Sequence, residues 1–322
     1  MIEGRLDQHS ATFAAGHQAV CLFVNDDGSA PVLKILADCG VSFIAMRCAG
    51  FDKIDVEAAE SLGISVARVP TYSPHSIAEH AISLMMCLNR RLHHAHMRMH
   101  QWDYSLSGLV GFELHGKTVG VVGTGAIGSA LCAVLKGFGC LVLAHDLKPS
   151  AHCQGMGVEY VSLEELLQRS DVVSLHCPLL PSTKHMISAQ RLALMKPGAM
   201  LINCSRGGLV DTLALIEALE SGHIGAAGLD VYEREGPLFF ANLGEMELNE
   251  RMQSWDRNFQ ILKSFPNVLI TPHSAFLTQE ALQSIAQTTI VNLTEFQLGQ
   301  SLSYQVCPCP EAGVPFIPAG QH

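Results

Sequence analysis

The chain has 322 residues, of which 16% are charged and 48% belong to the hydrophobic set, and its formal net charge is −10. This composition argues against disorder and predicts large apolar cores, most naturally in two domains. The acidic balance argues against a nucleic-acid or anionic-membrane partner, and no uninterrupted apolar stretch reaches the roughly eighteen residues needed to span a bilayer. Eleven cysteines, scattered through predicted strands and helices, are typical of reduced thiols, so we expect a cytoplasmic protein.

The first part of the chain alternates strand-like and helix-like patterns and predicts a small α/β unit with a parallel sheet. Its strands are expected at residues 19–24, 42–47 and 64–69. A long helical pattern then begins at Pro74, with Ser73 as its cap, and runs to about Met99.

Six more strands, separated by short helices, predict a doubly wound dinucleotide-binding fold. They are expected at residues 119–122, 141–144, 171–175, 199–203, 225–229 and 268–271. A last helix over 278–297 and a Pro/Gly-rich tail from Cys307, which we expect to be mobile, complete the chain. We expect residues 73–272 to form the dinucleotide-binding domain, and residues 1–72 with 273–322 to form the other domain. Two crossings between the domains would allow hinge closure of a cleft.

The most informative segment, residues 117–146, places three glycines between a buried strand and a helix. Gly123, Gly125 and Gly128 have the spacing of a pyrophosphate-binding turn, and the helix that follows offers free N–H groups to the anion. Asp146 ends the next strand, where a carboxylate binds the adenosine ribose hydroxyls and repels a 2′-phosphate. This favours NAD over NADP. A glycine-rich turn without a ligand would leave Asp146 unexplained.

Reactive side chains follow the later strands. Arg206 can grip a carboxylate with two parallel hydrogen bonds, the alternative being a surface salt bridge. Asp230 is expected to reach a nicotinamide amide, and Glu235 to approach an imidazole. His273 has the side chain suited to proton transfer near neutrality. Four further histidines are interpreted as a solvated helix face, so we expect no metal site; they are His93, His94, His96 and His100.

These segments resemble the D-2-hydroxyacid dehydrogenase family, and within it the fermentative D-lactate dehydrogenases of bacterial type. The similarity covers roughly residues 6–299 and includes VNDDGS, MRCAGFDKID, VPTYSPHSIAEHA, LNRRLH, GTGAIG, SLHCPL, MKPGAMLINCSRGGLVD, GLDVYERE, PLFF and HSAFLT. The resemblance implies an α/β protein in which a Rossmann-type NAD domain is inserted into a flavodoxin-like substrate domain.

The resemblance also implies roles for matching residues. Arg206 would bind the substrate carboxylate, His273 would exchange a proton with the substrate oxygen, and Glu235 would orient His273. Ala49 and Gly50 would bind the carboxylate through backbone N–H groups, and Tyr72 would line the pocket. Beyond the three glycines, the cofactor contacts would come from Ala126, Ile127, Asp146, Cys177, Pro178, Thr183, Cys204, Ser205, Arg206 and Asp230.

The implied function is reversible hydride transfer between NADH and pyruvate, giving D-lactate, in a homo-oligomer. The alternatives are a dehydrogenase for glyoxylate, hydroxypyruvate or a bulkier 2-oxo acid, and a non-catalytic NAD-sensing protein similar to corepressors. One departure stands out, because family members begin with an extra strand–helix–strand unit before the segment that matches Leu6. We therefore expect the strand at 19–24 to expose an unpaired edge and apolar surface, and the protein to be poorly stable.

Overall fold

The computed structural model describes residues 4–307, so the tail expected to be mobile lies outside the described residues from position 308 on. The chain forms two compact units, one from the residues up to Tyr72 and from Gln279 onward, the other Ser73–Thr278. Both contain parallel sheets, which confirms the two-domain α/β class. None of the described helices combines the length and apolarity needed to cross a bilayer.

The second crossing comes later than the expected residue 273. The backbone N–H of His273 donates to the Asp230 carbonyl at 2.8 Å. The Thr278 and Ser76 hydroxyls are hydrogen-bonded at 2.7 Å. These bonds tie residues 273–278 to the Ser73–Thr278 unit, whereas the sequence analysis assigned this stretch to the other domain.

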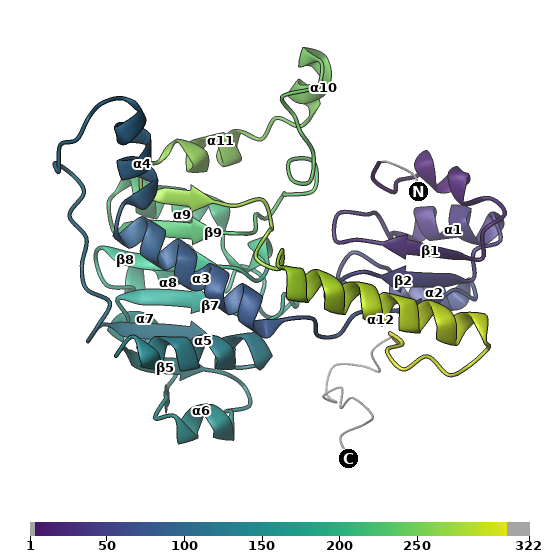
Figure 1. The fold of residues 1–322 in the computed structure, drawn as a ribbon, viewed down its shortest axis with the longest axis horizontal. Coiled ribbons are helices and arrows are strands. Elements are labelled where there is room, and N and C mark those ends of the chain that lie inside the picture. Colours follow the sequence, from purple (N-terminus) through teal and green to yellow (C-terminus); the bar gives the residue numbers. More distant parts are fainter. Residues whose placement is uncertain (1–3, 308–322) are drawn as a thin grey trace. The chain divides into compact units, whose positions relative to one another are not determined.

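The Ser73–Thr278 unit is built on a seven-stranded parallel sheet in the order β10-β9-β8-β7-β4-β5-β6 (Figure 1). Its strands are β4 (Thr118–Val122), β5 (Leu141–His145), β6 (Glu159–Tyr160), β7 (Val172–Leu175), β8 (Ala199–Asn203), β9 (Ile224–Leu229) and β10 (Val268–Ile270). The short β6 is an additional strand beside the six that were expected. The strand order reverses between β4 and β7: successive strands are added on one side of β4 up to β6 and on the other side from β7 on. Ligands of such sheets bind beyond the carboxyl ends of the strands at this switch point.

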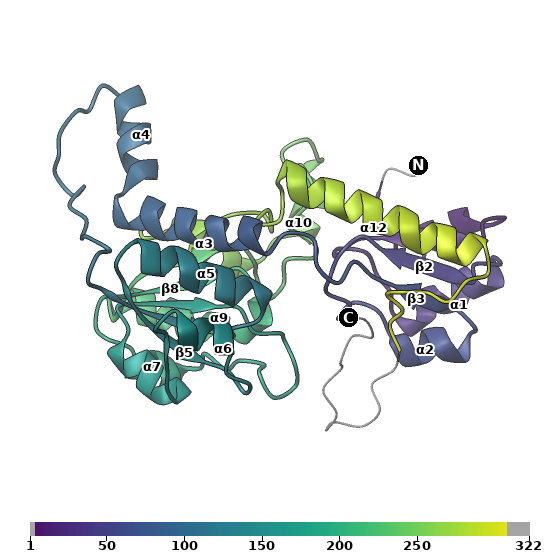
Figure 2. The same cartoon turned by 60° about the horizontal axis from the view of Figure 1, so that its bottom comes forward.

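Helices cover both faces of this sheet. They are α3 (Pro74–Asn89), α4 (Leu92–His100), α5 (Ala126–Gly137), α6 (Ala151–Gly155), α7 (Leu163–Arg169), α8 (Ala189–Leu194), α9 (Thr212–Glu220), α10 (Leu248–Gln253) and α11 (Arg257–Ser264). Figure 2 shows α3 and α5 on one face and α7 on the other. With both faces covered, β7 and β8 are buried along their whole length, as in other parallel sheets.

The single helix expected over residues 74–99 is wrong, because the chain breaks between α3 and α4. Arg91 has φ 53°, in the left-handed region. The buried side chain of Asn89 accepts from the Phe112 N–H at 2.8 Å and donates to the Phe112 carbonyl at 2.7 Å. These long-range bonds fix the end of α3, and no local sequence signal predicts them.

The other unit has a three-stranded parallel sheet in the order β1-β2-β3. Its elements are η1 (Ser10–Ala14), β1 (Ala19–Leu22), α1 (Ala30–Asp38), β2 (Phe43–Met46), α2 (Val56–Ser61), β3 (Ser65–Ala67) and α12 (Gln279–Gln297). Alternate residues of β2 serve two cores: Ile44 and Met46 pack with α1, while Phe43 stacks on Phe296 of α12 at a centroid distance of 4.6 Å.

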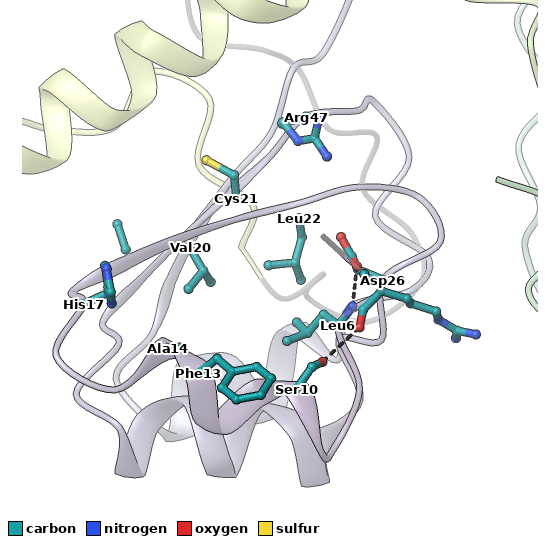
Figure 3. A pocket seen from close by; sticks show the side chains of 13 residues that line it. Leu6, Ser10, Phe13, Ala14, His17, Val20, Cys21, Leu22, Asp26 and Arg47 are labelled. Carbon is teal, nitrogen blue, oxygen red and sulfur yellow. Dashed lines mark hydrogen bonds between the residues drawn. The ribbon is translucent and has the colours of Figure 1, made fainter. Parts of the chain in front are cut away.

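Strand β1 has a neighbour on only one side among the described strands, as expected for the 19–24 segment. Beside it lies an open cavity of about 720 Å³, whose wall includes Phe13, Val20, Leu22 and Arg47 (Figure 3). Phe13 is 64% exposed, so apolar surface is accessible here. None of the side chains predicted to carry chemistry lines this cavity.

Candidate functional site

The glycine turn connects β4 to α5, and it lies at the point where the strand order of the sheet reverses. Gly123 has φ 94°, and a Cβ there would lie 2.7 Å from the Cys177 N. A Cβ on Gly128 would lie 1.9 Å from the Gly123 carbonyl oxygen. Only glycine fits these two positions. A Cβ on Gly125, in contrast, would meet nothing within 4 Å, so open space faces the start of α5, where helix N–H groups are available to a phosphate.

Asp146 follows β5 and faces this turn. Its Oδ2 accepts from the N–H of Thr124 at 2.6 Å and from the Thr124 hydroxyl at 3.0 Å, and its Oδ1 accepts from the Lys148 N–H at 2.9 Å. The Tyr160 hydroxyl donates to the Thr124 hydroxyl at 2.8 Å. The carboxylate is therefore held beside the glycine turn, and the donor and acceptor set fits a dinucleotide whose ribose carries free hydroxyls.

The segments after β7 and β8 meet at the same edge of the sheet. The Ser205 hydroxyl donates to the Cys177 carbonyl at 2.6 Å. Thr183 uses its hydroxyl locally, donating to the Pro178 carbonyl at 2.7 Å. Burial raises the pKa of the Cys177 thiol to about 11 and the pKa of Cys204 well above its ordinary value. Both thiols stay protonated near neutrality, which argues against a nucleophilic role for either.

Arg206 stands at the end of a tightly built turn after β8. The buried Asn203 side chain donates to the Arg206 carbonyl at 2.9 Å and accepts from the Ser205 N–H at 3.0 Å. The next residue, Gly207, lies so close to the chain after β9 that a Cβ would be 2.0 Å from the Tyr232 carbonyl carbon. The partly exposed guanidinium, whose Nη1 donates to the Ser205 carbonyl at 2.9 Å, is thereby carried next to the segment that bears Glu235.

Glu235 and His273 form a pair, the arrangement that the family resemblance implied. His273 Nδ1 lies 2.8 Å from Glu235 Oε1, and the other carboxylate oxygen accepts from the Tyr232 N–H at 3.0 Å. The side chains are 14% and 16% exposed. The Phe240 ring lies 5.8 Å from the imidazole. Both His273 and Phe240 have positive φ values, 53° and 65°, and such backbone strain concentrates at functional sites.

Asp230 has a structural role that the sequence did not reveal. Its Oδ1 accepts from the Thr271 hydroxyl at 2.5 Å and the Ser274 N–H at 2.9 Å, and its Oδ2 accepts from the Ala275 N–H at 2.9 Å. The carboxylate, 1% exposed, therefore anchors the turn that carries His273. His80 of α3 joins this network, with Nε2 3.0 Å from the Thr271 hydroxyl. A histidine within a helical pattern gives no local sign of such a distant partner, and His80 was therefore missed.

Three expected substrate residues belong to the other unit. Ala49 and Gly50 follow the carboxyl end of β2 and are partly exposed, as is Tyr72, the last residue before the first crossing. The Ala49 carbonyl accepts from Arg68 Nη1 at 2.8 Å, and the Gly50 carbonyl accepts from the Cys48 thiol at 3.2 Å.

The helix-face histidines make ordinary contacts. His94 Nε2 lies 2.5 Å from the Pro266 carbonyl, His93 Nε2 lies 3.5 Å from the same oxygen, and the Nε2 atoms of His96 and His100 are 3.3 Å apart. Among the side chains that the structure describes in residues 4–307, which leave out Glu250, no three of His, Cys, Asp or Glu gather in a way that could hold a metal ion.

Comparison with known proteins places this geometry in a family. Residues 82–275 match the model described as D-isomer specific 2-hydroxyacid dehydrogenase, NAD binding domain. The D-lactate dehydrogenase of Escherichia coli is 51% identical over 296 residues, which are 92% of this chain and 88% of that protein. The solved pyruvate reductase of Chlamydomonas reinhardtii has 54% identity and a TM-score of 0.89, covering 94% of this chain and 89% of that one. The D-lactate dehydrogenase of Lactobacillus jensenii, solved with NAD+, has 33% identity and a TM-score of 0.77, covering 95% of this chain and 91% of that one.

Proposed function

Since the chain belongs to the D-isomer specific 2-hydroxyacid dehydrogenase family, we propose that it is an NAD-dependent D-lactate dehydrogenase that reduces pyruvate and oxidises D-lactate. The observation that carries the proposal is the His273–Glu235 pair, with its 2.8 Å contact, at the same sheet edge as Arg206 and the glycine turn. The names of relatives support pyruvate as the oxo acid, because the Escherichia coli protein is a D-lactate dehydrogenase and the Chlamydomonas protein a pyruvate reductase.

The dinucleotide would be held by the backbone around Gly123, Gly125 and Gly128, with Ala126 and Ile127 at the start of the helix and Asp146 on the ribose. We propose further contacts from residues after the later strands, namely Cys177, Pro178, Thr183, Cys204, Ser205, Arg206 and Asp230. Bound NADH supplies the hydride for reduction. The chain's own residues bind and orient the substrate and move the proton.

In the proposed mechanism Arg206 grips the 2-oxo acid carboxylate and so fixes the orientation of its carbonyl. The N–H groups of Ala49 and Gly50 add hydrogen bonds to the carboxylate, and Tyr72 lines the pocket. Glu235 accepts a hydrogen bond from the Nδ1–H of His273 and so orients the ring, and the protonated Nε2 donates its proton to the carbonyl oxygen as negative charge develops there. In the reverse direction His273 removes the hydroxyl proton.

Stereospecific kinetics test this function. We expect the purified chain to oxidise NADH with pyruvate and to form D-lactate, as shown by absorbance and chiral analysis of the product. His273→Ala should mainly lower turnover, whereas Arg206→Ala should mainly weaken pyruvate binding. Higher kcat/KM on glyoxylate, hydroxypyruvate or a bulkier 2-oxo acid would identify a related dehydrogenase instead. NADH binding without oxidation by any 2-oxo acid would identify a non-catalytic NAD-sensing protein.

We also propose a fermentative, cytoplasmic enzyme that works as a homo-oligomer. The ten described cysteines are not in disulfides, which suits a reducing compartment. The segment from α4 to residue 112 exposes large apolar side chains, which favours a second copy as partner; they include Leu92, Trp102, Leu106 and Val110, at 55–85% exposure. Sedimentation equilibrium should give a dimer or larger species that Trp102→Asp weakens, and a monomer at micromolar concentration would refute the oligomer.

A further inference from the structure

We propose that Arg68 is a positioning residue for substrate binding, because it holds the turn of residues 48–51 in the conformation that presents two amide N–H groups to the substrate carboxylate. The inference rests on the proposed function, since that function makes this turn an anion-binding element. Every contact that carries it lies within the unit that contains β1, β2 and β3.

Arg68 follows β3 and grips the turn after β2 in two ways. Its Nη1 donates to the Ala49 carbonyl at 2.8 Å, and its guanidinium carbon lies 5.1 Å from the centroid of the Phe51 ring. The Arg68 backbone is itself fixed, because its N–H donates to the Tyr304 carbonyl at 3.1 Å and its carbonyl accepts from the Asn292 side chain at 3.0 Å. A planar, always charged group that both donates and stacks is suited to fixing a turn in this way.

The carbonyls of the turn are all engaged. The Cys48 carbonyl accepts from the Val69 N–H at 3.2 Å, and the Phe51 carbonyl from the Ile54 N–H at 3.1 Å. The Gly50 carbonyl accepts from the Cys48 thiol at 3.2 Å, and Arg68 takes the remaining one, that of Ala49.

Two N–H groups of the same turn, in contrast to its carbonyls, remain available to a ligand. Those of Ala49 and Gly50 have no hydrogen-bond partner within the described residues. Because a peptide unit is planar, a bond that fixes a carbonyl also fixes the N–H of the next residue. The Arg68 bond to the Ala49 carbonyl therefore directs the Gly50 N–H, one of the two groups proposed to bind the substrate.

The positive charge of Arg68 also favours an anion at this turn. Arg68 is half-buried, and among the described side chains of residues 4–307, which do not include that of Glu250, no carboxylate forms an ion pair with it. Burial lowers the pKa of its guanidinium from the ordinary value, yet arginine remains protonated in proteins. An uncompensated positive charge beside two free N–H groups favours an anion over a neutral ligand.

Arg47 supplies a matched control on the same unit. Its guanidinium carbon also lies 5.1 Å from an aromatic centroid, that of Phe23, but its side chain lines the cavity beside β1 (Figure 3). Arg47→Met thus removes the same charge and the same kind of stacking contact, and none of the hydrogen bonds of the turn.

The test compares Arg68→Met, Arg68→Lys and Arg47→Met with the unaltered chain, measuring pyruvate kinetics and the Kd of NADH. We expect Arg68→Met to raise the KM of pyruvate about tenfold or more, because a charged donor is lost, with kcat changed less than about threefold and the NADH Kd unchanged. Arg68→Lys, which retains charge and one donor, should recover part of the loss, and Arg47→Met should behave as the unaltered chain.

Four results would overturn the inference, the last of them together with the proposed function. An unchanged pyruvate KM in Arg68→Met would show that the contact does not position the turn. Equal losses in Arg68→Met and Arg47→Met would show a general effect of removing charge from this unit. If Arg68→Met does not fold, Arg68→Lys decides. An Arg68→Lys enzyme whose pyruvate KM and kcat equal those of the unaltered chain at every pH would contradict a positioning role for the planar guanidinium group. Lack of pyruvate reduction by the unaltered chain would refute the proposed function and this inference together.

Discussion

Replacing Gly207 by alanine tests how closely Arg206 must be placed. The new Cβ would lie 2.0 Å from the Tyr232 carbonyl carbon and 2.2 Å from the Glu233 N. Ordinary carbon contacts begin near 3.5 Å, so the two backbone segments have to separate by about 1.5 Å. Neither contact is with a flexible side chain that could rotate away. Because the Tyr232 N–H also binds Glu235, the displacement disturbs both halves of the proposed site.

A misplacement of about 1 Å can cost roughly a hundredfold in rate, which corresponds to about 2.7 kcal/mol of transition-state stabilisation. We therefore expect Gly207→Ala to lower kcat/KM for pyruvate about a hundredfold, with a loss of stability of about 1–3 kcal/mol from overpacking. The assay is NADH absorbance at varied pyruvate, with thermal melting of the same samples.

The adjacent Gly208 is the control. A Cβ there would lie 3.0 Å from Cδ2 of Leu179, a side-chain methyl that can move at little cost. Gly208→Ala should stay within about threefold of the unaltered enzyme. The reasoning is refuted if the two variants have the same kcat/KM, or if Gly207→Ala retains full activity.

The remaining predictions concern the cofactor and pH. Gly125→Ala meets no atom within 4 Å, so it should melt as the unaltered chain but bind NADH at least about tenfold more weakly, whereas Gly128→Ala should also lower the melting temperature. Fluorescence titration beside melting distinguishes the two, and equal behaviour would contradict the geometry. Asp146→Asn removes the charge that repels a 2′-phosphate, and the ratio of kcat/KM with NADPH to that with NADH should rise about tenfold or more; an unchanged ratio argues against Asp146 as the selector. Burial lowers the pKa of His176 to about 4. Below about pH 6.5 His176 is protonated in the unfolded chain but remains neutral in the folded chain until about pH 4. The free energy of unfolding should therefore decrease from pH 6.5 to pH 4 by up to about 3 kcal/mol. His176→Gln should lose less stability over that range in denaturant titrations, and an equal loss would exclude His176 as the cause.

Features that depend on neighbours along the chain could be predicted from the sequence. The spacing of Gly123, Gly125 and Gly128 dictates a turn between strand and helix, since the backbone itself needs glycine there. Strand ends were equally informative, because parallel strands deliver their carboxyl ends to one edge of a sheet. The strand ends suggested that Glu235 could approach an imidazole, and the family resemblance implied that this imidazole is His273; the two side chains lie 2.8 Å apart.

Local structure that depends on a distant partner could not be predicted from the sequence. The break after α3 depends on Asn89 reaching Phe112, and the late second crossing depends on Asp230 binding the backbone beyond His273. His80 enters the site only because α3 packs over the ends of β9 and β10. Helix propensity and motif spacing contain no information on such pairs.

The amino-acid sequence by itself determined the α/β class, the dinucleotide turn and the order of reactive residues along the chain, since hydrophobic period and glycine requirement are local properties. Only the tertiary structure decided that Asp230 anchors the His273 turn, that Gly207 packs against Tyr232, and that Arg68 holds the Ala49 carbonyl. These roles arise from side chains and backbone that meet across many residues, where packing and hydrogen-bond geometry select one arrangement among many that the sequence pattern permits.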